Sequence, residues 1–178
     1  CHGAHRWNQK TVFYDESARV PLIVSKKGET SKGESDVLVN TGVDMIPTLC
    51  DFAGIKPPFH LPGRSLKAPA LGKAMENKRE FVVTQNHMVQ CEEVDGKHLK
   101  PHGRMVRSER YKYCLYSEGK RRESLVDMVA DPGEMVNQAD NPEYKDVLNH
   151  HRAFLRKHAL QYDDKTALEM LGYVSSSN

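Results

Sequence analysis

The sequence predicts a mixed α/β chain that ends in a small antiparallel sheet covered by one long helix. Two neighbouring runs, 104–108 and 111–116, read as paired strands around a short connection. Further along, apolar side chains within residues 147–155 recur at helical spacing. Nearer the front, residues 44–54 carry a shorter apolar helical pattern. Together these patterns favour sheet and helix in one compact chain.

Residues 19–25 are the first predicted element. They are apolar and β-branched around Pro21 and are bounded by charged residues, which predicts a short buried strand. A proline fits near the start of an edge strand, where a missing N–H is tolerated. The Gly-, Ser- and Lys-rich residues 26–36 then predict a solvated loop.

The next predicted element is a helix from about Asp44 to Gly54. Met45, Leu49 and Phe52 lie on one helical face, and Pro47 stands among them. Because proline is harmless only in the first helical turn, the helix should begin near Asp44, with that side chain as the N-cap. Gly54 should end it in the left-handed conformation.

A proline-rich stretch over residues 57–69 follows and predicts an irregular connection between two structural units. Beyond it, residues 79–84 and 124–128 are predicted as further strands, and Asp131-Pro132-Gly133 as a turn. Asn141-Pro142 should start the long helix, with proline at its first position.

Composition and charge exclude some classes of partner. The chain has 26 basic and 24 acidic residues, so its net charge of +2 favours neither nucleic acid nor a membrane surface. Its apolar runs are too short to span a bilayer. No targeting segment is visible, but the first residue is Cys rather than Met, so localisation stays open.

Several short motifs occur in a fixed order. They are His5 and Lys10, Tyr14-Asp15-Glu16-Ser17, Arg19-Val20-Pro21-Leu22, Gly63-Arg64-Ser65-Leu66, Met105 through Tyr113, and Asp131-Pro132-Gly133-Glu134. In this order and at these distances the chain resembles the C-terminal part of a sulfatase of the arylsulfatase type, within the alkaline-phosphatase superfamily. The resemblance covers roughly residues 3 to 160.

The resemblance implies a domain organisation. Residues 1–71 would be the C-terminal piece of a large α/β catalytic domain, and residues 72–164 a small antiparallel-sheet and helix subdomain. Residues 165–178 would form a tail. The fold class is then α/β, the C-terminal portion of an alkaline-phosphatase-like sulfatase fold that ends in an α+β subdomain.

The resemblance also implies parts that this chain lacks. In such sulfatases a Cys or Ser in a Cys/Ser-x-Pro-x-Arg motif becomes formylglycine, the nucleophile, and acidic residues hold a calcium ion. None of the prolines here has Cys or Ser two positions before it. Both the nucleophile and the calcium ligands are therefore expected upstream, and no metal ligand is assigned here. The missing N-terminal part of the same protein is the expected partner.

Lys10 and His5 are the predicted catalytic residues. The family's lysine at the position of Lys10 contacts the substrate sulfate, and a fixed ammonium group would stabilise both the sulfate and the leaving oxygen. An imidazole at His5 could donate a hydrogen bond or protonate the leaving alkoxide, or could simply pack within its loop.

Substrate contacts are predicted in the polar stretch 85–104, with His87, His102 and Arg104 as the chosen residues. Cationic and hydrogen-bonding side chains there would suit a sulfated sugar, whereas the alternative is a solvated loop. The resemblance suggests an exported protein, periplasmic or extracellular.

Two other functions stay open at this stage. One keeps the fold but hydrolyses phosphonates or phosphodiesters, and the other is a non-catalytic fragment that binds sulfated glycans. The main prediction is a sulfatase acting on sulfated carbohydrates or small molecules. The 178-residue chain by itself is predicted to be poorly stable, because residues 1–71 lack the other strands of their sheet, and inactive, because it lacks the nucleophile.

Overall fold

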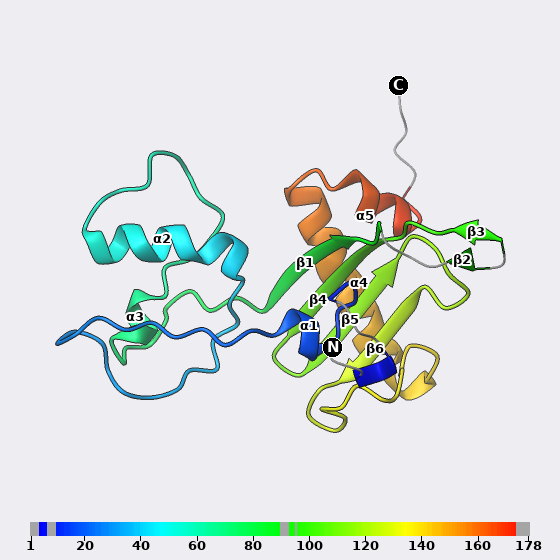
Figure 1. The fold of residues 1–178 in the computed structure, drawn as a ribbon, viewed down its shortest axis with the longest axis horizontal. Coiled ribbons are helices and arrows are strands. Elements are labelled where there is room, and N and C mark those ends of the chain that lie inside the picture. Colours follow the sequence, from blue (N-terminus) through cyan, green and yellow to red (C-terminus); the bar gives the residue numbers. More distant parts are fainter. Residues whose placement is uncertain (1–3, 7–9, 90–92, 95, 174–178) are drawn as a thin grey trace. The chain divides into compact units, whose positions relative to one another are not determined.

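The computed structural model describes residues 4–6, 10–89, 93–94 and 96–173 (Figure 1). They fall into two compact units. The sheet unit combines the residues up to 20 with those from 83 onward, and the α2 unit comprises residues 21–82. The predicted boundary at residue 71 concerns a larger domain with strands outside this chain, and it stays a prediction.

The sheet unit is built on four strands in the order β1-β4-β5-β6. They are β1 (Phe81–His87), β4 (His102–Ser108), β5 (Tyr111–Tyr116) and β6 (Glu123–Asp127). The predicted strand pair is confirmed, because β4 and β5 are antiparallel with Met105 opposite Cys114. β6 pairs antiparallel with β5 on its other side. A separate ribbon joins β2 (Glu93–Val94) to β3 (Lys97–His98).

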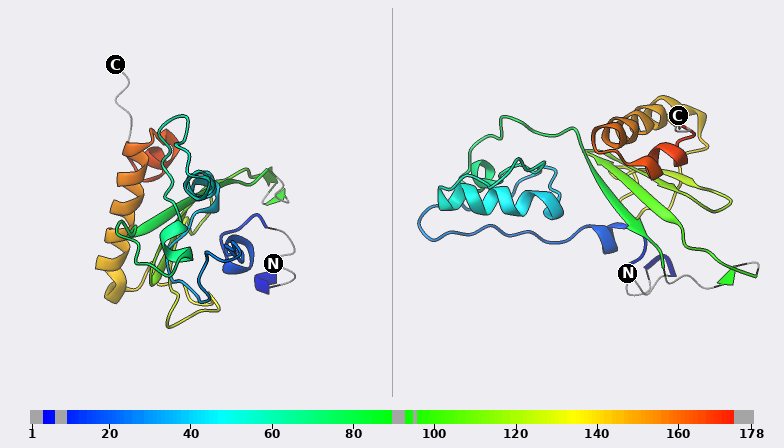
Figure 2. Two further views of the ribbon diagram at one scale, coloured as in Figure 1. Left: turned by 90° about the vertical axis from the view of Figure 1, so that its left-hand side faces the viewer. Right: turned by 90° about the horizontal axis from the view of Figure 1, so that it is seen from above.

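Side-chain alternation gives this sheet two faces with different neighbours. One face carries Val106 and Tyr113, both 0% exposed, and lies under α4 (Lys145–Gln161). Ser108 on that face is 2.9 Å from Nε2 of His151 in α4. The other face carries Met105 and Cys114 and receives the N-terminal segment. Figure 2 shows α4 and this blue segment on opposite sides of the sheet.

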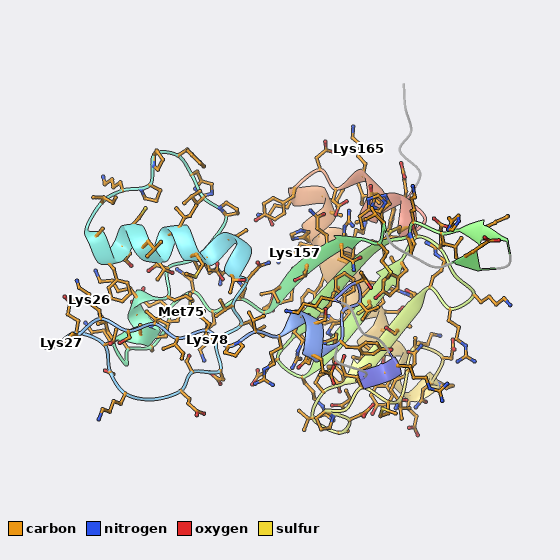
Figure 3. All side chains as sticks on the ribbon, viewed as in Figure 1. Lys26, Lys27, Met75, Lys78, Lys157 and Lys165 are labelled. Carbon is orange, nitrogen blue, oxygen red and sulfur yellow. The ribbon has the colours of Figure 1, made fainter. Side chains whose placement is uncertain are left out.

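The long helix begins as predicted, with Asn141 as the cap of η2 (Pro142–Tyr144), which leads directly into α4. Residues 165–170, expected as part of a tail, instead form α5 (Lys165–Met170). Asp164 caps this helix by accepting from the backbone of Ala167. The sequence interpretation missed this cap. Lys157 on α4 and Lys165 on α5 are exposed (Figure 3).

In the α2 unit, helix α2 (Thr41–Ala53) begins earlier than predicted, and α3 (Lys67–Ala70) follows it. The N-cap is Asn40, whose side chain accepts from Gly42, so the predicted capping role of Asp44 is wrong. Asp44 is instead 0% exposed and is held by both ends of the Arg79 guanidinium at 2.6 and 2.8 Å. Those bonds hold the pKa of Asp44 below its usual value against the opposing effect of burial.

Pro47 therefore lies inside α2, where it cannot donate to the carbonyl of Val43. The backbone of Gly63 approaches this same carbonyl so closely that a Cβ at residue 63 would lie 1.8 Å from its oxygen. The end of the helix is confirmed, because Gly54 has φ +70° and ψ +25°.

The predicted strand at residues 19–25 is wrong for this structure. The segment has no strand partner here, and Val20 and Ile23 are 52% and 87% exposed. A strand exists only by pairing, and apolar content cannot supply the neighbour. Within the described residues, no helix has both the length and the apolar character needed to cross a membrane.

Candidate functional site

Residues 11–15 lie along the sheet face opposite α4 and are fixed there by apolar contacts. The Phe13 side chain is 5% exposed and packs with Met105 and Cys114. Beneath it lies Gly103 of β4, where a Cβ would meet the Phe13 ring at 2.7 Å. The segment can approach β4 this closely because residue 103 has no side chain.

A buried ammonium group holds the same segment by its polar atoms. Lys112 Nζ, on β5, donates to the carbonyl of Phe13 at 3.0 Å and to Oε1 of Glu134 at 2.7 Å, and it pairs with Asp15 Oδ1. The other oxygen of Glu134 accepts the backbone N–H of Asp15 at 2.6 Å. The side chains of Lys112 and Glu134 are only 2% and 3% exposed. Buried charges persist when they are paired and hydrogen-bonded, as these are.

The carboxylate of Glu134 reaches Lys112 because of the turn before it. The backbone N–H of Glu134 donates to the carbonyl of Asp131 at 3.1 Å, which closes the predicted Asp-Pro-Gly turn. Glu134 itself adopts φ +54°, a left-handed conformation that few non-glycine residues take. A strained residue of this kind persists only where its surroundings fix it, and Lys112 and Asp15 do so here.

Lys10 stands immediately before the fixed segment. It is exposed, and the carbonyl of the next residue, Thr11, accepts from Nδ2 of Asn86 at 2.5 Å. The backbone that carries Lys10 is therefore tied to β1 while its ammonium group stays accessible. Its sulfate-binding role stays a prediction.

The side chain of His5 contacts this segment through its aromatic ring. Its ring lies parallel to that of Tyr14, with centroids 3.7 Å apart and an interplanar angle of 3°. Its Nε2 is 3.9 Å from a carboxylate oxygen of Glu16. Burial, reinforced by the charge of Glu134, raises the pKa of the Tyr14 hydroxyl, so Tyr14 stays neutral beside the imidazole. The structure thus brings both predicted catalytic residues, His5 and Lys10, to one anchored segment.

His87 and His102 also lie together, but on another part of the sheet unit. Their rings stack with centroids 4.0 Å apart and an interplanar angle of 13°. Adjacent residues of a strand point to opposite faces of the sheet. His102 therefore points away from the face on which Gly103 meets Phe13. The imidazole pair is therefore on the side of the sheet that carries α4, away from the face that holds residues 11–15. Its role in substrate binding stays a prediction.

Arg104 has a different place from the one expected. Its side chain is 6% exposed, and Nε and Nη2 donate to the two carboxylate oxygens of Asp164 at 2.6 and 2.8 Å. A third donor, Nη1, bonds the carbonyl of Gly103. The guanidinium lowers the pKa of Asp164, the residue that caps α5. This geometry argues against the predicted substrate contact and gives Arg104 a structural role in attaching α5.

The described part of the chain offers no group of three or more His, Cys, Asp or Glu side chains that could hold a metal ion. These residues therefore do not fit the calcium site that the resemblance implies. Its ligands, like the formylglycine nucleophile, stay predicted outside this chain.

Lys112 and Glu134 both lie within motifs of the sequence, but no role was predicted from the sequence for either residue. One signal was available, because Lys112 sits between two tyrosines in a strand whose neighbours are largely apolar. A lysine there needs a buried partner. Nothing local shows that the partners are Asp15 and Glu134, which stand 97 and 22 residues away.

Comparisons with known proteins agree with this architecture. A family model described as N-sulphoglucosamine sulphohydrolase, C-terminal, matches residues 3–161. A Delta 4,5-hexuronate-2-O-sulfatase of Bacteroides thetaiotaomicron is 38% identical over 155 residues, which is 85% of this chain and 31% of that protein. An N-acetylglucosamine-6-O-sulfatase of the same organism is 29% identical over 91% of this chain and 28% of its own length.

A crystal structure of a candidate sulfatase from Bacteroides thetaiotaomicron superimposes with a TM-score of 0.79 at 36% identity. The match covers 91% of this chain and 34% of that one. The chain thus spans about a third of the length of the curated relatives that it matches.

Proposed function

This chain belongs to the sulfatase family described as N-sulphoglucosamine sulphohydrolase, C-terminal, and from that membership we propose that the whole protein hydrolyses sulfate esters of carbohydrates. Two relatives support the substrate class, because one is named for a sulfated hexuronate and the other for a sulfated N-acetylglucosamine. The observation that supports the proposal is the anchored segment 11–15, which Lys10 directly precedes and against which the His5 ring stacks.

Lys10 would bind the sulfate group. A sulfate ester is anionic, and further negative charge develops on the bridging oxygen as the S–O bond breaks. An ammonium group held close to these oxygens stabilises that charge more in the transition state than in the free substrate. The bond between Thr11 and Asn86 fixes the backbone next to Lys10 and so limits the positions that its ammonium group can take.

His5 would assist the leaving group. Its ring is held against Tyr14 and near Glu16, an arrangement that fixes the plane of the imidazole. From there it would donate a hydrogen bond or a proton to the departing sugar oxygen. In the family, calcium and formylglycine polarise the sulfate and supply the nucleophile, and here both would come from outside this chain.

The test uses the full-length protein that contains this chain. We expect it to release sulfate from a 2-O-sulfated unsaturated hexuronate disaccharide or from a 6-O-sulfated N-acetylglucosamine, at a rate well above that with an aryl phosphonate monoester. Faster hydrolysis of the phosphonate would favour the alternative phosphonate hydrolase. Absence of turnover with every sulfate ester, for protein whose nucleophile is shown by mass spectrometry to be formylglycine, would contradict the proposal.

A further inference from the structure

We infer that Lys112 and Glu134 are positioning residues for the sulfate-binding segment, holding Lys10 and His5 where the substrate sulfate is bound. The inference rests on the proposed function and extends it to residues that would never touch the substrate. Three motifs far apart in the sequence carry it. They are the segment 13–15, Lys112 in β5, and Glu134 after the Asp-Pro-Gly turn.

The first step is that these contacts act on the backbone of the segment rather than on its surface. Lys112 bonds the carbonyl of Phe13, three residues after Lys10, and Glu134 bonds the N–H of Asp15, five residues after it. Together these two bonds fix the position and the direction of the segment backbone relative to β5. These bonds add to the contacts that the Phe13 ring and the Thr11 carbonyl already make.

The second step concerns His5. Its ring stacks on Tyr14, which lies between the two backbone atoms that Lys112 and Glu134 hold. The orientation of Tyr14 therefore depends on the same pair of charges, and that of His5 depends on Tyr14. One buried ion pair thus contributes to the placement of both predicted catalytic residues.

The third step is that the pair itself is fixed by the sheet. Lys112 lies opposite Val126 of β6 and opposite Arg107 of β4, so its Cα cannot move without disturbing both ladders. Its ammonium group is 2% exposed and has three oxygen partners, the full number of protons that it can donate. Because all three N–H donors of the Lys112 ammonium group are used, Lys112 links the segment firmly to the sheet. A catalytic side chain needs rigid support of this kind.

The test is a mutant cycle in the full-length protein, with sulfate release from the sulfated sugar that the protein hydrolyses as the assay. Lys112→Met removes the charge and keeps the length of the side chain. We expect kcat to fall by about 10- to 100-fold, because displacements of about 1 Å in a catalytic group have effects of that size. In a background that carries both Lys10→Ala and His5→Ala, the same change should lower kcat by less than about twofold, because its effect passes through these two residues.

The matched control is Arg152→Met, which removes an ion pair with Glu123 between α4 and β6 on the other face of the sheet. Its kcat should stay within about twofold of the unmodified protein. Should Lys112→Met fail to fold, Glu134→Gln, which retains size and one acceptor oxygen, enters the same cycle. An unchanged kcat in the folded variant, or a loss that persists in full when both Lys10 and His5 are replaced by Ala, would overturn the inference.

A second readout does not depend on turnover. Hydrogen exchange of the amides of residues 10–16 should be faster in Lys112→Met than in the unmodified protein, while Arg152→Met leaves them unchanged. Lack of sulfatase activity in the unmodified protein would refute the proposed function, and the exchange rates would still show whether Lys112 anchors the segment. Equal exchange in all three proteins would refute the anchoring itself.

Discussion

The sheet unit and the α2 unit bury different kinds of side chain. The sheet unit closes around apolar residues, and Val106, Leu125 and Leu155 are each 0% exposed. In residues 21–82, the side chain with no exposure is the carboxylate of Asp44, while Ile46 and Leu49 of α2 are 57% and 62% exposed. Both units contain buried ion pairs, but the sheet unit also has an extended apolar core, whereas the α2 unit is organised around Asp44 and Arg79.

The difference bears on which unit can support function by itself. Apolar burial is the dominant favourable term in folding, and in the sheet unit it stabilises the sheet that carries Lys112, which together with Glu134 holds the catalytic segment. A buried ion pair defines geometry but contributes little net stability. We therefore expect the α2 unit to need further apolar contacts, which the larger domain implied by the family would supply.

The largest effect should follow from breaking the ion pair of the α2 unit. In the full-length protein, Asp44→Ala leaves the guanidinium of Arg79, 12% exposed, without its carboxylate. We expect local stability to fall by about 3–5 kcal/mol. Hydrogen exchange of the α2 amides measures it, with the amides of β4 and β5 as an internal reference.

Asp51→Ala is the matched control for this experiment, because that carboxylate is 46% exposed on the same helix and pairs with Lys67. Its cost should be about 1 kcal/mol or less. If Asp44→Ala were as mild as Asp51→Ala, the α2 unit would not be organised around Asp44.

A smaller effect compares one leucine from each unit. Leu155→Ala should destabilise the sheet unit by about 2–5 kcal/mol, because it leaves a cavity in a closed core. In the 178-residue chain, Leu49→Ala should change stability by less than about 0.5 kcal/mol, since the residue is exposed. In the full-length protein its cost should rise above about 1 kcal/mol if the larger domain covers α2. Chemical denaturation of both proteins decides, and equal small costs in both would show that α2 stays uncovered.

The same contrast explains what the sequence could predict. The β4–β5 pair follows from local alternation, and the Asn141 cap with Pro142 at the start of η2, just before α4, follows from local sequence; both are confirmed. The start of α2 was misplaced, because Pro47 was confined to the first turn, whereas the close approach of Gly63 accompanies a proline in the helix interior. The strand at residues 19–25 was predicted from its apolar and β-branched side chains, and no strand among the described residues pairs with it.

The residues of the candidate site also differ in how far the sequence could predict them. His5 and Lys10 were found through the family resemblance, and His87 and His102 through their residue type. Arg104 was chosen for its charge, but its partner Asp164 lies 60 residues away and could not be read from local sequence. The roles of Lys112 and Glu134 were not predicted for the same reason, because their partners also lie far away in the sequence. Local sequence patterns could not predict the long-range ion pairs of this site.

The most direct test of the account is the turnover of Lys10→Ala in the full-length protein. Loss of a fixed charge at the reacting group predicts that kcat/KM for a sulfate ester falls by about 100- to 1000-fold, with folding intact by circular dichroism. Lys165→Ala, which removes an exposed lysine from α5, should leave kcat/KM unchanged. Equal activity of Lys10→Ala and the unmodified protein would contradict the central claim that this segment binds the sulfate.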